Sequence, residues 1–256
     1  MQPTETRHFY LIRGLIREAR HWGVLPDLLR QAFPGAQVFT LDIPGAGDYF
    51  RQASPLSVDA MVEHMRADFL QRSRAGENNT LIAISLGGMI AARWLQAHPQ
   101  DFQRAVLINT SFGGLSPLYH RLRPGAVLSM LRAAVTPPRQ REGVILRLVS
   151  NNADVFDEGL ALWDSIRRER PVSAANAARQ LWAASWFQLP AVRPAVPVLL
   201  LASTHDRMVS VECSRAIARA WQAPLREHSS GGHDLSLDDP GWILEQVRRF
   251  PETVPL

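Results

Sequence analysis

Short apolar runs alternate with helical patterns along the chain. Strand-like runs, rich in aliphatic and β-branched residues, occur at 8–13, 36–43, 80–85, 104–109, 196–202 and, more weakly, 223–228. Between them, apolar residues recur at helical spacing at about 22–33, 58–72, 86–98, 211–221 and 240–250. Wholly apolar strands separated by amphipathic helices are typical of a parallel sheet covered on both faces. The pattern therefore predicts an α/β fold, doubly wound, with a mostly parallel sheet of about six strands.

This alternation breaks once, between Asn109 and Val196, where no convincing strand occurs. The segment has the pattern of several helices interrupted by Pro137, Pro138 and Pro171. We predict that residues 112–190 form an inserted helical cap, and that residues 1–111 and 191–256 together form the α/β core.

Candidate chemistry begins at the stretch "LIAISLGGMIAARWL" (81–95), where a strand pattern changes directly into a helix pattern. Ser85 stands at the junction, and a serine at the tip of a strand exposes its hydroxyl above the sheet edge. The tight turn requires small neighbours, here Ala83 and Gly87, and the following helix directs N–H groups toward the site. A serine that merely caps the helix is the alternative interpretation.

The segment "AISLG" resembles the G-x-S-x-G nucleophile elbow of the α/β-hydrolase family, with Ala83 replacing the first glycine. The resemblance covers the chain except for the insertion, and it implies a nucleophile, an acid and a histidine in that order. "STHDRMVS" brings Asp206 to the acid position, and "GGHDLSLDDP" brings His233 to the histidine position. The resemblance thus implies Ser85 as nucleophile, His233 as base and Asp206 as its orienting acid.

The same resemblance implies an oxyanion hole made of two backbone N–H groups. One belongs to Leu86, directly after the nucleophile, and the other to Leu15 in "LIRGLIREARHWG" (11–23). Gly14 is retained there, whereas Arg13 occupies the position at which the family usually has histidine. Arg13 has two interpretations, a structural arginine or a side chain that binds a carboxylate of the substrate.

Composition narrows the choice of partners. All 28 basic residues are arginine, and the net charge is only +4 although the pI is about 10.1. Since arginine keeps its charge above pH 12, the high pI reflects the late ionisation of Cys213, the terminal amine and the tyrosines. We therefore expect no nucleic-acid partner. Without lysine, a Walker A loop is excluded.

Other classes are excluded by absent patterns. No run approaches the roughly 18 apolar residues of a membrane span, so we expect no membrane association. A single cysteine and an amino terminus without signal-peptide features predict a cytoplasmic protein. Metal-ligand spacings such as His-x-x-His and Cys-x-x-Cys are missing, so no metal and no cofactor are expected.

The positive charge lies in the predicted cap, which has 10 arginines against 6 acidic residues, whereas 1–111 has 11 against 10 and 191–256 has 7 against 8. One interpretation is solvated helix faces. The other is that arginines such as Arg121, Arg123, Arg167 and Arg168 bind an acidic partner. A resemblance to the family's pimeloyl-ester carboxylesterases, whose caps bind such carriers, implies acyl carrier protein docking on the basic cap.

The resemblance implies a serine carboxylesterase that cleaves a small-molecule ester or acyl substrate through an acyl-enzyme. Two alternatives remain: a thioesterase, acyltransferase, C–C hydrolase or lyase with the same residues, or a non-catalytic binding module. In this family the cap is variable and decides the substrate. If the cap binds an acyl carrier, Trp163, Trp182 and Trp186 would line an acyl channel that binds the substrate; the other interpretation of each is core packing.

Overall fold

The computed structural model describes residues 7–73, 78–189 and 192–251. In these residues six strands form one parallel sheet in the order β2-β1-β3-β4-β5-β6. The strands are β1 Arg7–Ile12, β2 Gln37–Leu41, β3 Asn78–Ile84, β4 Arg104–Ile108, β5 Val198–Ser203 and β6 Leu225–His228. The predicted α/β class is confirmed, and each strand lies within a few residues of the apolar run that predicted it.

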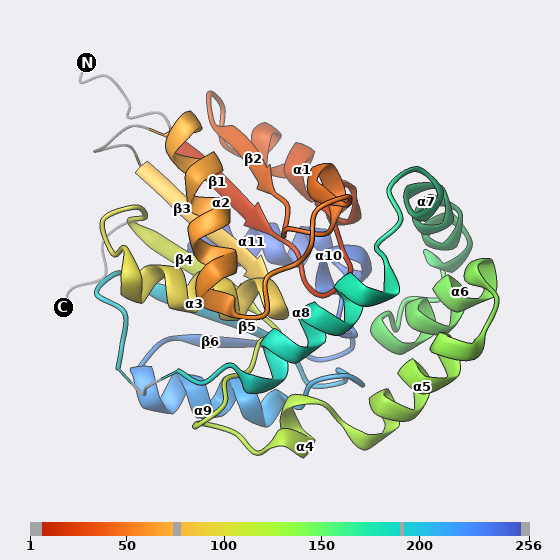
Figure 1. Cartoon of the computed structure of the whole chain (residues 1–256). Helices are drawn as coiled ribbons and strands as arrows, with labels where there is room; N and C mark the ends of the chain where they lie inside the picture. Colours follow the sequence, from red (N-terminus) through yellow and green to blue (C-terminus); the bar gives the residue numbers. More distant parts are fainter. Residues whose placement is uncertain (1–6, 74–77, 190–191, 252–256) are drawn as a thin grey trace.

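Helices cover both faces of the sheet because side chains of successive strand residues point to opposite faces. Tyr10 and Ile12 pack in the core with α2 (Val58–Arg72), α3 (Leu86–Ala97) and α9 (Val211–Trp221). Phe9 and Leu11 pack in a second core with α1 (Leu25–Ala32) and α11 (Pro240–Arg249). Figure 1 shows α2 and α3 in front of the sheet and α11 behind it. Both faces are buried, so the loops at the carboxyl ends of the strands remain for a site.

Local signals in the sequence set the helix starts. Ser57 Oγ accepts a hydrogen bond from Ala60 N at 3.2 Å at the start of α2, as expected for an N-cap serine. Asp239 does the same for α11, where its Oδ1 accepts from Trp242 N at 2.8 Å. The helical pattern predicted from residue 22 begins later, because a short 3-10 turn, η1 (Ala19–Trp22), precedes α1.

Five helices lie between β4 and β5 in the described part of the predicted insertion. They are α4 (Leu118–Arg121), α5 (Pro124–Val135), α6 (Pro138–Val149), α7 (Phe156–Glu169) and α8 (Ala174–Trp186). We call these helices the cap. Its two stems are joined where Gly113 N donates to Phe187 O at 3.1 Å and Leu189 N donates to Gly113 O at 3.3 Å. Leu146 and Trp163 are central to a separate small core within the cap.

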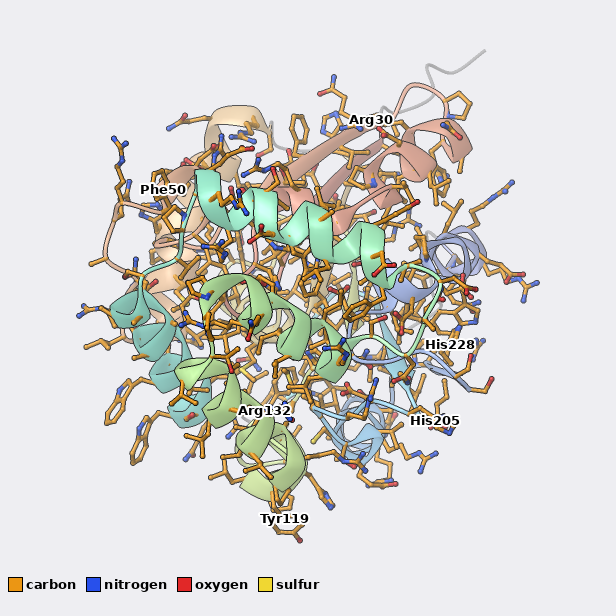
Figure 2. The ribbon with its side chains drawn as sticks, turned by 90° about the vertical axis from the view of Figure 1, so that its right-hand side faces the viewer. Arg30, Phe50, Tyr119, Arg132, His205 and His228 are labelled. Atoms are coloured by element: carbon orange, nitrogen blue, oxygen red, sulfur yellow. The ribbon has the colours of Figure 1, made fainter. Side chains whose placement is uncertain are left out.

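The cap lies over the carboxyl ends of the strands (Figure 1). Figure 2 views the molecule from the cap side, with Arg132 of α5 near the middle and His205 toward the margin. The remaining short elements, η2 (Gly47–Tyr49) and α10 (Leu235–Asp238), belong to loops at the same end of the sheet. Within the described ranges, no helix combines the length and the apolar character needed to cross a membrane.

Candidate active site

Ser85 occupies the turn between β3 and α3 with a strained backbone. Its φ is 58° and its ψ is −121°, a positive φ that residues other than glycine rarely adopt. The turn is held from the neighbouring strand, since Ser85 N donates to Ile108 O at 2.9 Å. Thr110 Oγ1 donates to Ser85 O at 2.8 Å. The backbone of this turn is therefore strained, and two hydrogen bonds, one to β4 and one from Thr110 just after it, stabilise the turn.

The small residues around Ser85 are required by the close passage of β1. A Cβ atom on Gly87 would lie 2.5 Å from the carbonyl oxygens of both Ile12 and Arg13. One on Gly14 would lie 2.9 Å from the Cβ of Ser85. Backbone atoms cannot move aside as flexible side chains can, so larger residues here would displace the turn or the end of β1.

Asp206 and His233 meet across the carboxyl end of the sheet. His233 Nδ1 lies 2.6 Å from Asp206 Oδ2, and the two residues are 5% and 2% exposed. Asp206 Oδ1 accepts from the backbone N–H of Met208 at 2.7 Å and of Val209 at 2.9 Å. In the neutral imidazole, a proton on Nδ1 facing the carboxylate leaves Nε2 as the acceptor. Nε2 is buried and has no hydrogen-bond partner among the described residues.

Asn109 supports this pair, a role that was not predicted from the sequence. Its φ is 46°, its Nδ2 donates to His233 O at 2.8 Å, and its Oδ1 accepts from Ser203 N at 2.8 Å. The side chain therefore joins the histidine loop to the end of β5. A polar residue at the carboxyl end of a buried parallel strand was the available signal, since sites gather there.

The turn after β1 contains the Leu15 N–H, which is expected to form one side of an oxyanion hole. Its two neighbouring N–H groups are already bonded. Arg17 N donates to Gly14 O at 3.2 Å, and Ile16 N donates to Gln180 Oε1 at 2.9 Å. Leu15 N has no hydrogen-bond partner in the described structure. Leu86 is the first residue of α3, a position at which the N–H has no intrahelical partner. The two N–H groups proposed as donors are thus available near Ser85.

Arg13 lies beside this turn but bonds to the protein itself. Its Nη2 and Nη1 contact Asp234 Oδ2 at 2.5 Å and Asp234 Oδ1 at 3.1 Å, and Nη1 also donates to Ser236 Oγ at 2.5 Å. The two charged side chains are only 4% and 5% exposed. Burial alone would raise the pKa of Asp234, but the Arg13 charge and the hydrogen bonds from Arg13 and Ser236 hold it below its usual range. These contacts favour the structural interpretation of Arg13 over binding of a substrate carboxylate.

A cavity of about 480 Å³ opens in front of Ser85 and His233, between the core and cap helices α5, α6 and α8. Its lining is largely apolar, but one end is charged, where Arg17 Nη1 lies 3.3 Å from Glu142 Oε2. The Arg17 guanidinium also lies over the Trp163 ring, 3.9 Å from its centroid. Burial lowers the pKa of Arg17, partly offset by the negative charge of Glu142.

The three cap tryptophans are outside the lining of this cavity. Trp163 is 1% exposed and packs under Arg17 and against His21 in the cap core. Trp182 and Trp186 are 54% and 67% exposed. Helical spacing explains the exposure of these two tryptophans. One face of α8, with residues 177, 178, 181, 184 and 185, lines this cavity and a smaller pocket beside Ser85, so Trp182 and Trp186 lie on the outer face. No tryptophan of this set is among the described lining residues.

In the described ranges, no three His, Cys, Asp or Glu side chains gather as metal ligands. Cys213 is buried in α9, and burial raises the pKa of its thiol. His205, beside Asp206 in the chain, is exposed.

The sequence matches the α/β-hydrolase fold family over residues 8–240. The chain therefore belongs to this family, whose members keep their sites at the carboxyl ends of the strands.

Individual relatives include an esterase and a biotin biosynthesis protein. A segment of 127 residues, 47% of this chain and 48% of the relative, is 31% identical to methyl jasmonate esterase 1 of Vitis vinifera. The bifunctional biotin biosynthesis protein BioHC of Teredinibacter turnerae is 24% identical in an alignment that covers 97% of this chain and 45% of that protein. Both alignments span about half the length of these relatives. The solved structure of a Rhodococcus esterase, RhEst1, has the same fold, with a TM-score of 0.75 at 18% identity over 96% of this chain and 90% of that one.

Proposed function

We propose that the protein hydrolyses carboxylic esters through an acyl-enzyme on Ser85. The observation that carries the proposal is the buried bond of 2.6 Å between His233 Nδ1 and Asp206 Oδ2, with Nε2 left unpartnered. Ser85 and His233 line the same cavity, so a substrate there can contact both. Hydrolases among the relatives are consistent with this activity.

The chemistry follows from these positions. His233 Nε2 accepts the proton of Ser85 as Oγ bonds to the carbonyl carbon, and Asp206 stabilises the imidazolium that forms. The carbonyl oxygen gains negative charge, which the N–H groups of Leu15 and Leu86 stabilise. The bond from the carbonyl carbon to the alcohol oxygen then breaks, and this oxygen takes the proton from Nε2. Water, deprotonated by His233, releases the acid and restores Ser85.

A fluorophosphonate probe and p-nitrophenyl acetate test the proposal directly. We expect the probe to label the protein at Ser85, and Ser85→Ala to abolish labelling and lower kcat by about 10⁴-fold or more. Ser165→Ala changes an exposed serine of α7 and is the matched control; this variant should keep both probe labelling and ester turnover. His233→Ala should lose turnover while His205→Ala retains it. Labelling of the Ser85→Ala variant, or full turnover without His233, would refute the assignment.

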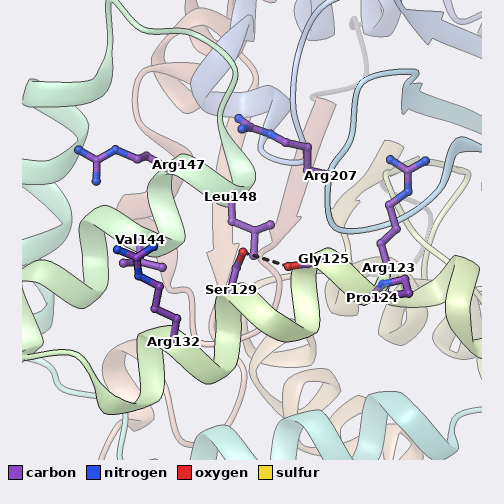
Figure 3. Close-up of a pocket in the computed structure, with 9 residues that line it drawn as sticks. All are labelled: Arg123, Pro124, Gly125, Ser129, Arg132, Val144, Arg147, Leu148 and Arg207. Atoms are coloured by element: carbon purple, nitrogen blue, oxygen red, sulfur yellow. Dashed lines mark hydrogen bonds between the residues drawn. The ribbon is translucent and has the colours of Figure 1, made fainter.

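We also propose that the basic cap binds an acidic acyl carrier. Of the four arginines named from sequence, Arg121 bonds to backbone carbonyls, and Arg167 and Arg168 pair with Asp164. Arg123 also bonds to a backbone carbonyl, that of Asp206 at 2.8 Å, but with three other arginines it lines an open hollow of about 830 Å³, which Figure 3 shows. This hollow is lined by cap residues and by Arg207 of the loop after β5. The four are Arg123, Arg132, Arg147 and Arg207, and none has a carboxylate partner in the described structure.

Salt dependence tests this second proposal. Attraction between unlike surface charges speeds association and is screened within about 10 Å at 0.1 M salt. We expect kcat/KM for an ester carried on acyl carrier protein to exceed that for the free ester at low salt, and the advantage to vanish near 0.5 M. Arg132→Gln with Arg147→Gln should reduce it likewise, whereas Arg226→Gln, exposed on β6, should not. Equal turnover of both substrates at all salt concentrations would contradict carrier binding.

A further inference from the structure

Two hollows of unequal size meet at Ser85. The larger is the cavity of about 480 Å³ described above, and the smaller has about 60 Å³. Ser85 and Leu15 line both hollows. His233 lines only the large cavity, and Leu86 lines only the small pocket. His233, which transfers the proton, therefore faces the large cavity at Ser85, whereas Leu86, one proposed oxyanion donor, faces the small pocket.

If the proposed esterase mechanism holds, this asymmetry indicates which hollow binds the alcohol part of an ester and which binds the acyl part. The alcohol oxygen must come within hydrogen-bond reach of His233 Nε2 to receive its proton. The group attached to this oxygen therefore extends into the large cavity, which His233 lines. The carbonyl oxygen points to the N–H groups of Leu15 and Leu86. The remaining substituent of the carbonyl carbon, the acyl chain, is directed to the small pocket.

The small pocket limits the length of the acyl chain. A volume of about 60 Å³ holds roughly four to six water-sized spheres, which corresponds to an acyl group of about two to four carbons. Met89 and Val209 form part of its wall and are 8% and 7% exposed. Ser111 also lines it, and its buried Oγ has no hydrogen-bond partner in the described structure. A long hydrocarbon chain would leave this hydroxyl against apolar atoms, which is unfavourable.

We infer that the substrate is an ester of a short acyl group with a bulky, largely apolar alcohol. An acyl chain tethered to a carrier protein would need the large cavity instead, so this inference and the acyl-carrier proposal exclude each other. In the first step the bond from Ser85 Oγ to the acyl carbon forms and the bond from that carbon to the alcohol oxygen breaks. The proton that left Ser85 passes through His233 to the alcohol. The alcohol then leaves through the large cavity, and water hydrolyses the short acyl-enzyme.

Two ester series test the inference on the unmodified protein. In p-nitrophenyl esters from acetate to decanoate, kcat/KM should be highest at two to four carbons. It should fall by about tenfold or more with the first methylene that no longer fits, and stay low to decanoate. In acetate esters of methanol, benzyl alcohol and naphthylmethanol, kcat/KM should rise with the size of the alcohol.

Variants separate the two pockets. Met89→Ala widens only the small pocket and should move the optimum of the p-nitrophenyl series to longer acyl chains. Val209→Ala makes the same test if the Met89 variant folds poorly. Ala177→Leu narrows only the large cavity, so it should lower kcat/KM for naphthylmethyl acetate and leave the optimum acyl length unchanged.

Preference for methyl decanoate over naphthylmethyl acetate would overturn the inference, because it would mean that the large cavity binds the acyl chain and the small pocket the alcohol. This failure is distinguishable from failure of the proposed function. Probe labelling of Ser85 together with a long-acyl optimum removes only the inference. Absence of both labelling and turnover removes the esterase proposal on which it rests.

Discussion

The buried pair of Arg13 and Asp234 allows a sharp test of how the site is held together. Replacing Asp234 with Asn removes the negative charge opposite a guanidinium that is only 4% exposed. A buried charge without its partner costs about 3–5 kcal/mol of unfolding free energy. In a chain of this size each kcal/mol lowers Tm by about 2–4 °C, so we expect a decrease of roughly 6–20 °C.

Urea unfolding at pH 7 measures this loss. The same substitution at Asp27, which pairs with Arg30 at 2.7 Å on the surface, is the matched control and should cost less than about 1 kcal/mol. The double variant Arg13→Met with Asp234→Leu should be more stable than Asp234→Asn alone, since it leaves no unpaired charge. If Asp234→Asn unfolds at the same urea concentration as the unmodified protein, the reasoning about this pair is refuted.

The pair also predicts an effect on catalysis and on acid stability. Arg13 precedes the turn of Leu15, and Asp234 follows His233, so losing the pair loosens both proposed catalytic segments. A misplacement of about 1 Å can lower turnover by roughly 10²-fold. Because the pKa of Asp234 is held below its usual range, its stabilisation is present above about pH 4 and is lost as pH falls through the lowered value. The Asp234→Asn variant should lack this part of the acid-induced loss of stability.

Three further changes test other parts of the structure. Asp206→Asn should lower kcat by about 10⁴-fold in ester hydrolysis with little change in Tm, and a loss below tenfold would contradict its role. Gly87→Ala should reduce thermal stability and soluble yield, because its Cβ would meet two backbone carbonyl oxygens at 2.5 Å; a normal Tm would contradict this. Burial raises the pKa of Asp42 to about 6, so its ionisation lowers stability as pH rises from about 4 to 6. At roughly 1.4 kcal/mol per pKa unit, the stability advantage of the unmodified protein over Asp42→Asn should shrink by about 3 kcal/mol between pH 4 and 7, and a constant difference would refute the shift.

The sequence was sufficient to predict the fold because strands appear as short apolar runs and helices as apolar residues at helical spacing. The four inner strands β1, β3, β4 and β5 are buried on both faces, so their runs are continuous and apolar, whereas the edge strand β6 is partly exposed and gave a weaker signal. The start of α2 is marked by its N-cap Ser57. The family resemblance also implied that His233 pairs with Asp206, and the structure brings them together because the loops after β5 and β6 lie at the same edge of the sheet.

Side-chain partners across long distances in the chain were not predictable. Arg13 and Asp234 are 221 residues apart, and nothing in either local pattern indicates that they pair. The cap tryptophans had two interpretations, an acyl channel or core packing, because they are large and apolar. Which face of α8 meets the core, however, depends on how the cap docks, and that docking placed Trp182 and Trp186 on the outer face.

The cap and the proposed oxyanion turn form one connected structure. Ile16, with a positive φ of 61°, donates its N–H to Gln180 of α8, and Arg17 pairs with Glu142 of α6. A strained β-branched residue persists only where its surroundings hold it, and here the holding groups belong to the cap. The cap therefore fixes the position of the adjacent Leu15 N–H as well as shaping the cavity. We expect Gln180→Ala to lower kcat for even the smallest ester, p-nitrophenyl acetate, which makes no use of the far end of the large cavity. A cap that only selects substrates by size would leave kcat for this ester unchanged and would raise KM for bulky esters alone.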